Sequence, residues 1–273
     1  MPVRPLACPC CRAARWWRLM PLSLFAPLEG LIAPAPAAGR VAFLKAQPYA
    51  HRGLHGGAVI ENSRAAFRAA IALGHGIETD VQAARDGEAM VFHDATLERL
   101  TESTGELAAH TPAELGKVTL RGTSETIAQL PEILALIGGQ VPVLIEIKAK
   151  GPRVAPLCLS VRRALEGYRG EAAIMSFNPL VGAWFAENAA RIVRGLVVSE
   201  EGKSGVKGVI ERWLSMAKAK PDFLAYDVRD LPSKFAGAAR ARGIPVLTWT
   251  VRDAEAERRA FAHADEAIYE KPA

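Results

Sequence analysis

Residues Gly76–Gln82 read GIETDVQ and residues Val141–Lys148 read VPVLIEIK, and these two runs decide the fold. Each is short, apolar and rich in β-branched side chains, which is typical of a buried strand. The first run nevertheless carries two acids, Glu78 and Asp80, two positions apart. Side chains on a strand alternate between its faces, so both acids point to the same side. A charge on a buried strand is costly unless it is paired or used, and these acids therefore indicate a site.

The same spacing occurs in the second run, where Glu146 and Lys148 lie two positions apart. In a β/α barrel, the side chains that carry out chemistry gather at the carboxyl ends of the strands. Two further expected strands end in polar residues, one at His51-Arg52 and the other at His93. Together these residues predict a charged barrel mouth.

Outward from these runs, short apolar strands alternate with longer helix-like segments, which predicts a parallel sheet. The expected strands are Gln47–His51, Gly76–Gln82, Ala89–His93, Val141–Lys148, Ala172–Met175, Ile192–Val198, Phe223–Tyr226, Pro245–Val251 and Ala267–Glu270. This set fits a closed eight-strand barrel with one surplus piece, so the predicted fold class is α/β, an irregular (β/α)8 TIM barrel.

An open doubly wound sheet is the competing fold. It would place a G-x-G-x-x-G loop after the first strand, and Gly53–Gly57 (GLHGG) lacks that spacing. Too few residues separate Gln82 from Ala89 to hold a crossover helix, so we expect the barrel to be irregular there. The segment Asn62–Leu73 has helical spacing with Asn62 as its expected cap. The long stretch Asp94–Gln129 is either a lid or an ordinary surface excursion.

The net charge of +5 lies outside the expected barrel. Residues 1–45 contain six basic side chains and one acid, which leaves residues 46–273 neutral overall. A nucleic-acid footprint would lie on the folded domain as a basic stripe, so we expect no nucleic-acid partner. We expect a leader at residues 1–45, disordered or targeting, followed by a barrel domain at residues 46–273.

The leader contains an apolar segment, Leu19–Ala38, that follows a basic stretch and ends in an Ala-Pro-Ala tripeptide, as in a secretory signal peptide. Pro21, Pro27 and Glu29 interrupt this segment, which favours a cytoplasmic location over export to the periplasm or beyond. The segment is also too short and too broken for a membrane span. The sequence leaves open whether the leader touches a membrane and which oligomeric state the chain adopts.

The three acids Glu78, Asp80 and Glu146 form a set of oxygen donors. Mg²⁺ and Ca²⁺ prefer carboxylate oxygens, whereas zinc usually takes His or Cys ligands. We therefore expect one divalent cation, Mg²⁺ or Ca²⁺, at these residues. The alternative is a structural network in which the acids pair with Arg52 and Lys148.

The histidines His51 and His93 end different strands, so a barrel can place them across one cleft. Imidazoles titrate near neutral pH, and such a pair can act as general base and general acid on the two sides of a phosphorus centre. His55 follows the first strand closely and could line the mouth.

The residues of the mouth resemble the motifs of the glycerophosphodiester phosphodiesterases, a family of PLC-like phosphodiesterases. The matching motifs, in order over residues 47 to about 271, are His51-Arg52-Gly53, Glu61-Asn62-Ser63, Gly76–Val81, Asp86-Gly87, Val91–Asp94, Leu130-Pro131, Ile145–Lys148, Ser176-Phe177 and Trp249–Val251. One His-Arg-Gly would be a weak signal, but the order and spacing of the series make the resemblance specific.

The resemblance implies an irregular β/α barrel that uses a divalent cation to hydrolyse glycerophosphodiesters to glycerol 3-phosphate and an alcohol. The roles that it implies are metal binding by Glu78, Asp80 and Glu146, acid–base catalysis by His51 and His93, and contact with the phosphate or substrate, or support of that contact, by Arg52, Lys148, Glu61 and Trp249.

Two positions depart from the family pattern. The family often has Asn after the Trp-Thr-Val strand, where this chain has Arg252, and its last strand commonly ends in Asp, where this chain has Glu270. Both positions lie outside the metal and histidine set, so they put substrate fit and local structure in question and leave the reaction class unchanged.

Three functions are weighed on this basis. The first is hydrolysis of glycerophosphodiesters, small-molecule substrates. The second is the same chemistry on lysophospholipids, which would need an apolar groove. The third is a catalytically silent barrel used for binding, which the intact Glu78/Asp80 and His51/His93 pairs disfavour. The nucleophile, either water or a neighbouring glycerol hydroxyl that forms a cyclic phosphate, is left open.

Overall fold

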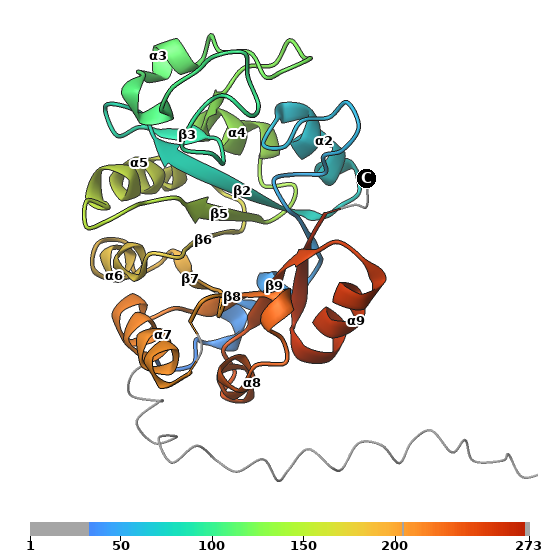
Figure 1. Ribbon diagram of the computed structural model, residues 1–273, viewed down its shortest axis with the longest axis vertical. Coiled ribbons are helices and arrows are strands. Elements are labelled where there is room, and N and C mark those ends of the chain that lie inside the picture. The colour runs from blue at the N-terminus through green and yellow to red at the C-terminus, as the bar shows by residue number, and fades with distance from the viewer. Residues whose placement is uncertain (1–32, 204, 271–273) are drawn as a thin grey trace, which may run out of the picture.

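The computed structural model describes residues 33–203 and 205–270 of the chain. Within that part, eight parallel strands close into a barrel, in the order β1-β10-β9-β8-β7-β6-β5-β2, and β2 pairs with β1 to complete the ring (Figure 1). These strands are β1 (Tyr49–Ala50), β2 (Gly76–Ala83), β5 (Val143–Ile147), β6 (Ala172–Ser176), β7 (Val193–Val198), β8 (Phe223–Asp227), β9 (Val246–Val251) and β10 (Glu266–Tyr269). The predicted barrel is confirmed.

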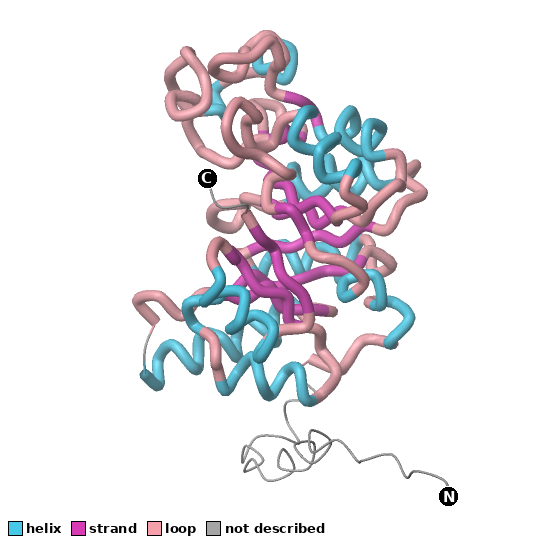
Figure 2. The backbone as a smooth tube through the Cα atoms, turned by 90° about the vertical axis from the view of Figure 1, so that its right-hand side faces the viewer, coloured by secondary structure: helices cyan, strands magenta, loops and turns pink. Residues whose placement is uncertain are grey.

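Helices connect the strands and surround them, and Figure 2 shows the strands at the centre with helices outside. The helices are α2 (Arg64–Ala72), α3 (Pro112–Leu115), α4 (Leu130–Ile137), α5 (Ala155–Glu166), α6 (Pro179–Asn188), α7 (Gly205–Ala219), α8 (Lys234–Ala241) and α9 (Ala254–His263). Their apolar residues recur at helical spacing, as in α2, where Ala66, Phe67 and Ala70 are buried against the sheet. The helices thereby cover the barrel wall, except for α3, which lies in the stretch between β3 and β4.

The predicted irregularity lies directly after β2. Here β3 (Ala89–Val91) turns back antiparallel along β2, and β4 (Ala128–Gln129) pairs antiparallel with β3. We expected Ala89–His93 to run to the barrel mouth as one of the parallel strands. This was wrong about its direction, because β3 runs antiparallel to β2. Because β2 is eight residues long and runs past its barrel pairing, β3 has room to return beside it.

The return of β3 nevertheless brings His93 to the site. Val91 is in register with Val81, and the backbone N–H of Phe92 donates to the carbonyl of Asp80 at 3.1 Å. His93 therefore follows at the level of Asp80, although its strand runs in the opposite direction from those of the ring.

The stretch Asp94–Gln129 forms a loop-rich lobe at one end of the molecule, apart from the ring of strands (Figures 1 and 2). Its residues Leu97, Leu107 and Leu115 share an apolar cluster with Met90 of β3 and with Phe92, which follows β3. Short helices, η4 (Leu107–Ala109) and α3, and the capping box of α3 fix its path. The lobe is a packed part of the fold, and two of its side chains contact site residues: Asp94 contacts His93, and Arg99 contacts Glu61.

The segment before β1 also packs on the barrel. It forms the short helices η2 (Ala38–Arg40) and η3 (Ala42–Lys45), and it buries Val41 and Leu44 with barrel residues. The folded part thus begins before residue 46, the boundary that we expected, because these apolar side chains close one end of the barrel. Residues 1–32 of the expected leader lie outside the described residues.

Two local points complete the fold. Helix α2 is capped by Ser63, whose hydroxyl accepts from the backbone N–H of Ala66, and not by Asn62 as we expected. Across the described ranges, we find no helix with the length and apolar character needed to cross a bilayer.

Candidate active site

A cavity of about 690 Å³ opens at the carboxyl ends of the strands. Seven of the nine predicted site residues line it: His51, Arg52, Glu78, His93, Glu146, Lys148 and Trp249. The other two, Asp80 and Glu61, lie behind this lining and contact it. The structure therefore brings together all nine residues that the sequence singled out.

The acids Glu78, Asp80 and Glu146 are buried at the base of the cavity, and each offers a carboxylate oxygen within 4.8 Å of the others. Strand pairing explains this proximity. Asp80 on β2 is in register with Glu146 on β5, and Glu78 precedes Asp80 by two positions on the same face. The alternation that we read from the sequence thus places three carboxyl groups in one small volume.

The environment divides these acids into two kinds. Burial raises the pKa of Glu78 well above its ordinary value, and repulsion from Asp80 and Glu146 adds to the shift. Burial likewise raises the pKa of Glu146 to about 7. Burial would also raise the pKa of Asp80, but the positive charges of Lys148 and Arg52 outweigh it and hold that pKa below its usual value. Asp80 is thus the acid that the protein itself keeps ionised.

Two cations provide that compensation. The Nζ of Lys148 lies 3.1 Å from Asp80 Oδ1 and 2.8 Å from Glu146 Oε1. The guanidinium of Arg52 lies 3.2 Å from Asp80 Oδ2 and donates to Glu61 Oε1 at 2.8 Å. The ion-pair network that we named as the alternative to a metal site is therefore present, and the question is whether it satisfies all three acids.

The network leaves Glu78 incompletely satisfied. Its Oε2 accepts from the backbone N–H of Arg52 at 3.0 Å, whereas its buried Oε1 has no hydrogen-bond partner in the described part of the chain. An oxygen buried in this way is costly, and a divalent cation would satisfy it while keeping Glu78 and Glu146 ionised. The donor set therefore fits Mg²⁺ or Ca²⁺ better than an ion-pair network alone.

The loop between β1 and α2 folds over the acids through two residues in the left-handed region, Arg52 (φ 55°) and Asn62 (φ 56°). Asn62 donates from Nδ2 to Asp80 Oδ2 at 3.0 Å and accepts from the Thr79 hydroxyl at 2.8 Å. Asn62 is thus a positioning residue for Asp80, a role that we missed by reading it as a helix cap. Left-handed backbone is unusual outside glycine but is tolerated by Asn, which agrees with its place here.

Each of the two histidines has a carboxylate at Nδ1. His51 Nδ1 lies 2.5 Å from Glu270 Oε1, and His93 Nδ1 lies 2.7 Å from Asp94 Oδ1. Burial lowers the pKa of His51 and that of His93, which favours neutral rings. Because the pKa of each partner acid is also low, the acids are ionised and Nδ1 carries the proton in both rings. The Nε2 atoms are left free to accept a proton.

The predicted residues Glu61 and Trp249 have supporting contacts. Glu61 accepts from Arg52 and also from Arg99, which in turn donates to Asp94 beside His93. This chain of ion pairs joins the lobe to the first loop. Trp249 donates from Nε1 to the carbonyl of Ala225 at 2.9 Å and stands edge to face against the half-exposed Phe177 at the cavity wall.

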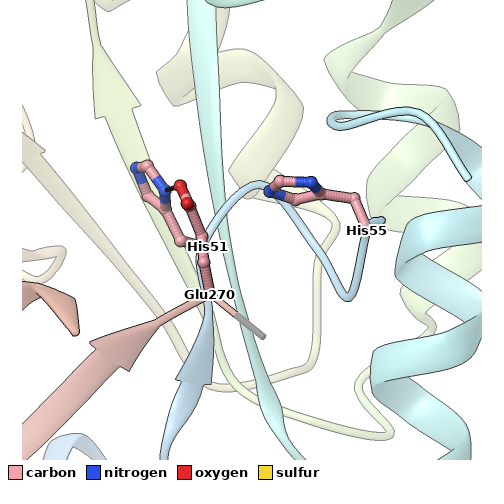
Figure 3. Close-up of side chains that lie close together, drawn as sticks. All are labelled: His51, His55 and Glu270. Atoms are coloured by element: carbon pink, nitrogen blue, oxygen red, sulfur yellow. Dashed lines mark hydrogen bonds and ion pairs between the residues drawn. The ribbon is translucent and has the colours of Figure 1, made fainter. Parts of the chain in front are cut away.

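Glu270 is a second residue, after Asn62, whose role the sequence reading missed. Figure 3 shows its carboxylate against the His51 ring, with His55 alongside. We had noted Glu270 only as a departure from the family pattern. Its position directly after the last barrel strand, next in the ring to the strand that ends at His51, was the signal that could have found it.

Comparison with known proteins agrees with this geometry. The model of the glycerophosphoryl diester phosphodiesterase family matches residues 51–269, which include all nine predicted site residues. The chain belongs to this family. It is accordingly a glycerophosphodiester phosphodiesterase, a hydrolase of phosphoric diesters, as the resemblance implied.

Relatives with known sequence or structure cover most of the chain. The glycerophosphodiester phosphodiesterase of Caldanaerobacter subterraneus subsp. tengcongensis is 28% identical over 240 residues, which is 84% of this chain and 96% of that protein. A phosphodiesterase of Oleispira antarctica, in complex with the product sn-glycerol-3-phosphate, has a TM-score of 0.72 at 23% identity and covers 83% and 93% of the two chains. The glycerophosphodiester phosphodiesterase of Thermotoga maritima has a TM-score of 0.65 at 23% identity, with 82% and 94% covered. The two structures show the same fold.

The raised pKa of Glu146 makes a prediction about stability. The pKa of Glu146 is about 7 in the folded protein, whereas its ordinary value is 4.5. The folded state therefore binds this proton more tightly than the unfolded state does. The stability that this proton confers is fully present below about pH 4.5 and is lost as the pH rises through about 7. In EDTA, the thermal midpoint of unfolding should therefore decrease as the pH is raised from 5 to 8. Glu146→Gln should make this decrease smaller. Glu102→Gln, at an exposed acid, is the control and should leave the decrease unchanged.

Proposed function

We propose that this chain hydrolyses glycerophosphodiesters to glycerol 3-phosphate and an alcohol, with a divalent cation at Glu78, Asp80 and Glu146 and proton transfer by His51 and His93. The observation that carries the proposal is the buried acid cluster with its unsatisfied Glu78 oxygen, flanked by two histidines whose Nε2 atoms are free. The product bound to the Oleispira antarctica phosphodiesterase supports the proposed product.

A phosphodiester carries one negative charge, which moves onto the non-bridging oxygens as the nucleophile approaches. Arg52 and Lys148 line the cavity beside the acids, and their positive charges would stabilise that anion where it develops. Burial would lower the pKa of Lys148, but the negative charges of Asp80, Glu146 and Glu78 outweigh it and hold that pKa above its usual value, so this amine stays charged. A bound cation would supply Lewis-acid stabilisation of the same oxygens.

The two histidines would divide the proton transfer. With Nδ1–H donated to a carboxylate, each ring presents Nε2 as an acceptor, so one ring can take the proton of the attacking hydroxyl. The other ring binds a proton at Nε2 before the step and donates it to the leaving alcohol. The ring that takes a proton and the ring that gives one are each held by a separate acid, Glu270 or Asp94.

The cavity wall favours a polar alcohol over an acyl chain. Strands β8 and β9 lie across the ring from β2 and β5, and the last residue of β8 together with residues after the two strands supplies six charged side chains to the lining. These side chains are Asp227, Arg229, Arg252, Asp253, Glu255 and Arg259. Burial of a lipid tail against them would desolvate charges without compensation, so glycerophosphodiesters fit this wall better than lysophospholipids.

We also propose a cytoplasmic location. Ala33 is buried with Ala236, Ala239 and Ile244, so cleavage after Ala37 or Ala38 would remove a packed residue. The N-terminus of the protein purified from cells, measured by mass spectrometry, should therefore precede Ala33. A start after Ala37 or Ala38 would indicate export and contradict the proposal.

Turnover can be tested directly. The full chain is incubated with glycerophosphocholine, and glycerol 3-phosphate is measured with Mg²⁺, with Ca²⁺ and with EDTA. We expect product with at least one cation and almost none in EDTA. If several headgroups give no product with either cation, the proposed reaction is wrong, and full activity in EDTA would refute the metal dependence.

Two substitutions separate the proposed roles. His93→Ala should lower kcat by about 10²- to 10⁴-fold and leave cation binding nearly intact, because it removes a proton-transfer group and no ligand. Glu146→Ala should weaken cation binding, measured by calorimetry, by about tenfold or more, because it removes one of three oxygen donors. His263→Ala and Glu132→Ala, both outside the cavity, are the controls. Full activity in both test variants would show that the assignment of the site is wrong.

A further inference from the structure

Three neighbouring strands of the ring end at one level, and the residue after each is polar. His51 follows β1, Glu270 follows β10 and Arg252 follows β9, and the three strands are adjacent in the order β1-β10-β9. The backbone confirms this alignment, because His51 N–H donates to Tyr269 and Glu270 N–H donates to Val251, both at 2.9 Å. The side chains therefore form a row along the rim.

The row is joined by direct contacts. Glu270 Oε1 accepts from His51 Nδ1 at 2.5 Å and from an Nη of Arg252 at 3.0 Å, while Glu270 Oε2 accepts from Arg252 Nε at 2.6 Å. The Arg252 fork thus holds both oxygens of the carboxylate, a geometry that fixes its plane as well as its position. The other ring nitrogen of His51, Nε2, lies 3.8 Å from Glu78 on the side of the acid cluster.

We infer that Arg252 and Glu270 act as one positioning unit for His51: Arg252 orients Glu270, and Glu270 fixes the His51 tautomer with Nδ1 protonated and Nε2 free. This inference rests on the proposed role of His51 in proton transfer. Glu270 and Arg252 need not touch the substrate to fulfil it. The two departures from the family pattern are then one feature. Glu270, whose side chain is longer than the Asp of the family, is held by Arg252, which stands where the family often has Asn.

The histidine beside the lobe has a similar arrangement, which supports this account. His93 Nδ1 donates to Asp94, and Asp94 accepts in turn from Arg99. Both histidines that line the cavity are thus backed by an acid and then by an arginine. An unpaired acid at hydrogen-bond distance could take the ring proton or rotate, and an arginine fork opposes both.

A different explanation exists for the same side chains. His51, His55 and Glu270 each offer an atom within 4.8 Å of the others, close enough to share a cation, and the buried Nε2 of His55 has no hydrogen-bond partner among the described residues. The guanidinium of Arg252 on Glu270 argues against a cation there, because it already supplies the positive charge. A second explanation is that Arg252, whose side chain is 59% exposed and lines the cavity, binds the substrate itself.

A double-mutant cycle separates these explanations. Glu270→Gln should lower kcat by about 10²-fold or more, because the amide no longer favours one tautomer of His51. Arg252→Gln should lower kcat by about three- to tenfold, and the double variant should match Glu270→Gln alone, because Arg252 acts only through Glu270. KM and cation affinity should stay within about twofold of the wild type in all three.

The matched control lies at the other end of the same two strands. Arg240 donates to Asp265, which precedes β10 and accepts from the backbone N–H of Val246 on β9. Arg240→Gln removes an arginine–acid pair of the same kind outside the cavity, so it should leave kcat unchanged. Thermal midpoints of all variants establish that each is folded.

Three outcomes would overturn the inference. A higher KM in Arg252→Gln, with effects that multiply in the double variant, would show that Arg252 binds substrate. If His55→Asn lowers kcat as much as Glu270→Gln does, a cation shared by His51, His55 and Glu270 would be indicated. Wild-type kcat in Glu270→Gln, with His51→Ala inactive, would reject the positioning unit and leave the proposed function intact. Activity retained by His51→Ala would instead reject the proposed role of His51, and the inference with it.

Discussion

The rest of the site depends on one electrostatic constraint, the burial of Glu78, Asp80 and Glu146 within 4.8 Å of one another. Like charges at this distance in a medium that solvates them poorly cannot all stay ionised without compensation. Lys148 and Arg52 compensate for Asp80. Lys148 also pairs with Glu146, but burial outweighs that contact, and the pKa values of Glu78 and Glu146 stay elevated. The buried acids thus favour additional positive charge at the mouth of the barrel, which a bound cation would supply.

The unusual backbone of the first loop follows from that constraint. Arg52 and Asn62 adopt positive φ angles, and this conformation turns an N–H toward Glu78 and a side-chain amide toward Asp80. Gly53 continues the turn at φ 78°, where an added Cβ would lie 2.8 Å from that of Ala66. Conformational strain of this kind persists only where surrounding contacts determine it, and here hydrogen bonds to buried carboxylates do so.

The parts of the site that depend on strand period could be predicted, and those that depend on chain path could not. The spacing of Glu78 and Asp80 predicted a shared face, and the alternation of strands and helices predicted the barrel. The antiparallel return of β3 was marked in the sequence only by a connection too short for a helix and by the turn signal Asp86-Gly87, and neither gave the position of β3 relative to the ring. Asn62 was misread because Asn suits both a helix cap and a left-handed turn. Glu270 was missed because its partner, His51, is some 220 positions away, and only the closure of the ring makes them neighbours.

The residues of the site come from two parts of the fold, the closed ring and the lobe between β3 and β4. The closed ring carries the three acids and His51, whereas His93 and Arg99 lie where the lobe begins. The lobe packs on an apolar cluster that it shares with β3 and that is separate from the clusters of the ring. Segments with separate cores can open locally without global unfolding. Loss of order in the lobe would therefore disable one proton-transfer group while the acid cluster stays assembled, so that the capacity to hold a cation and the capacity to turn over substrate are separable properties of one molecule.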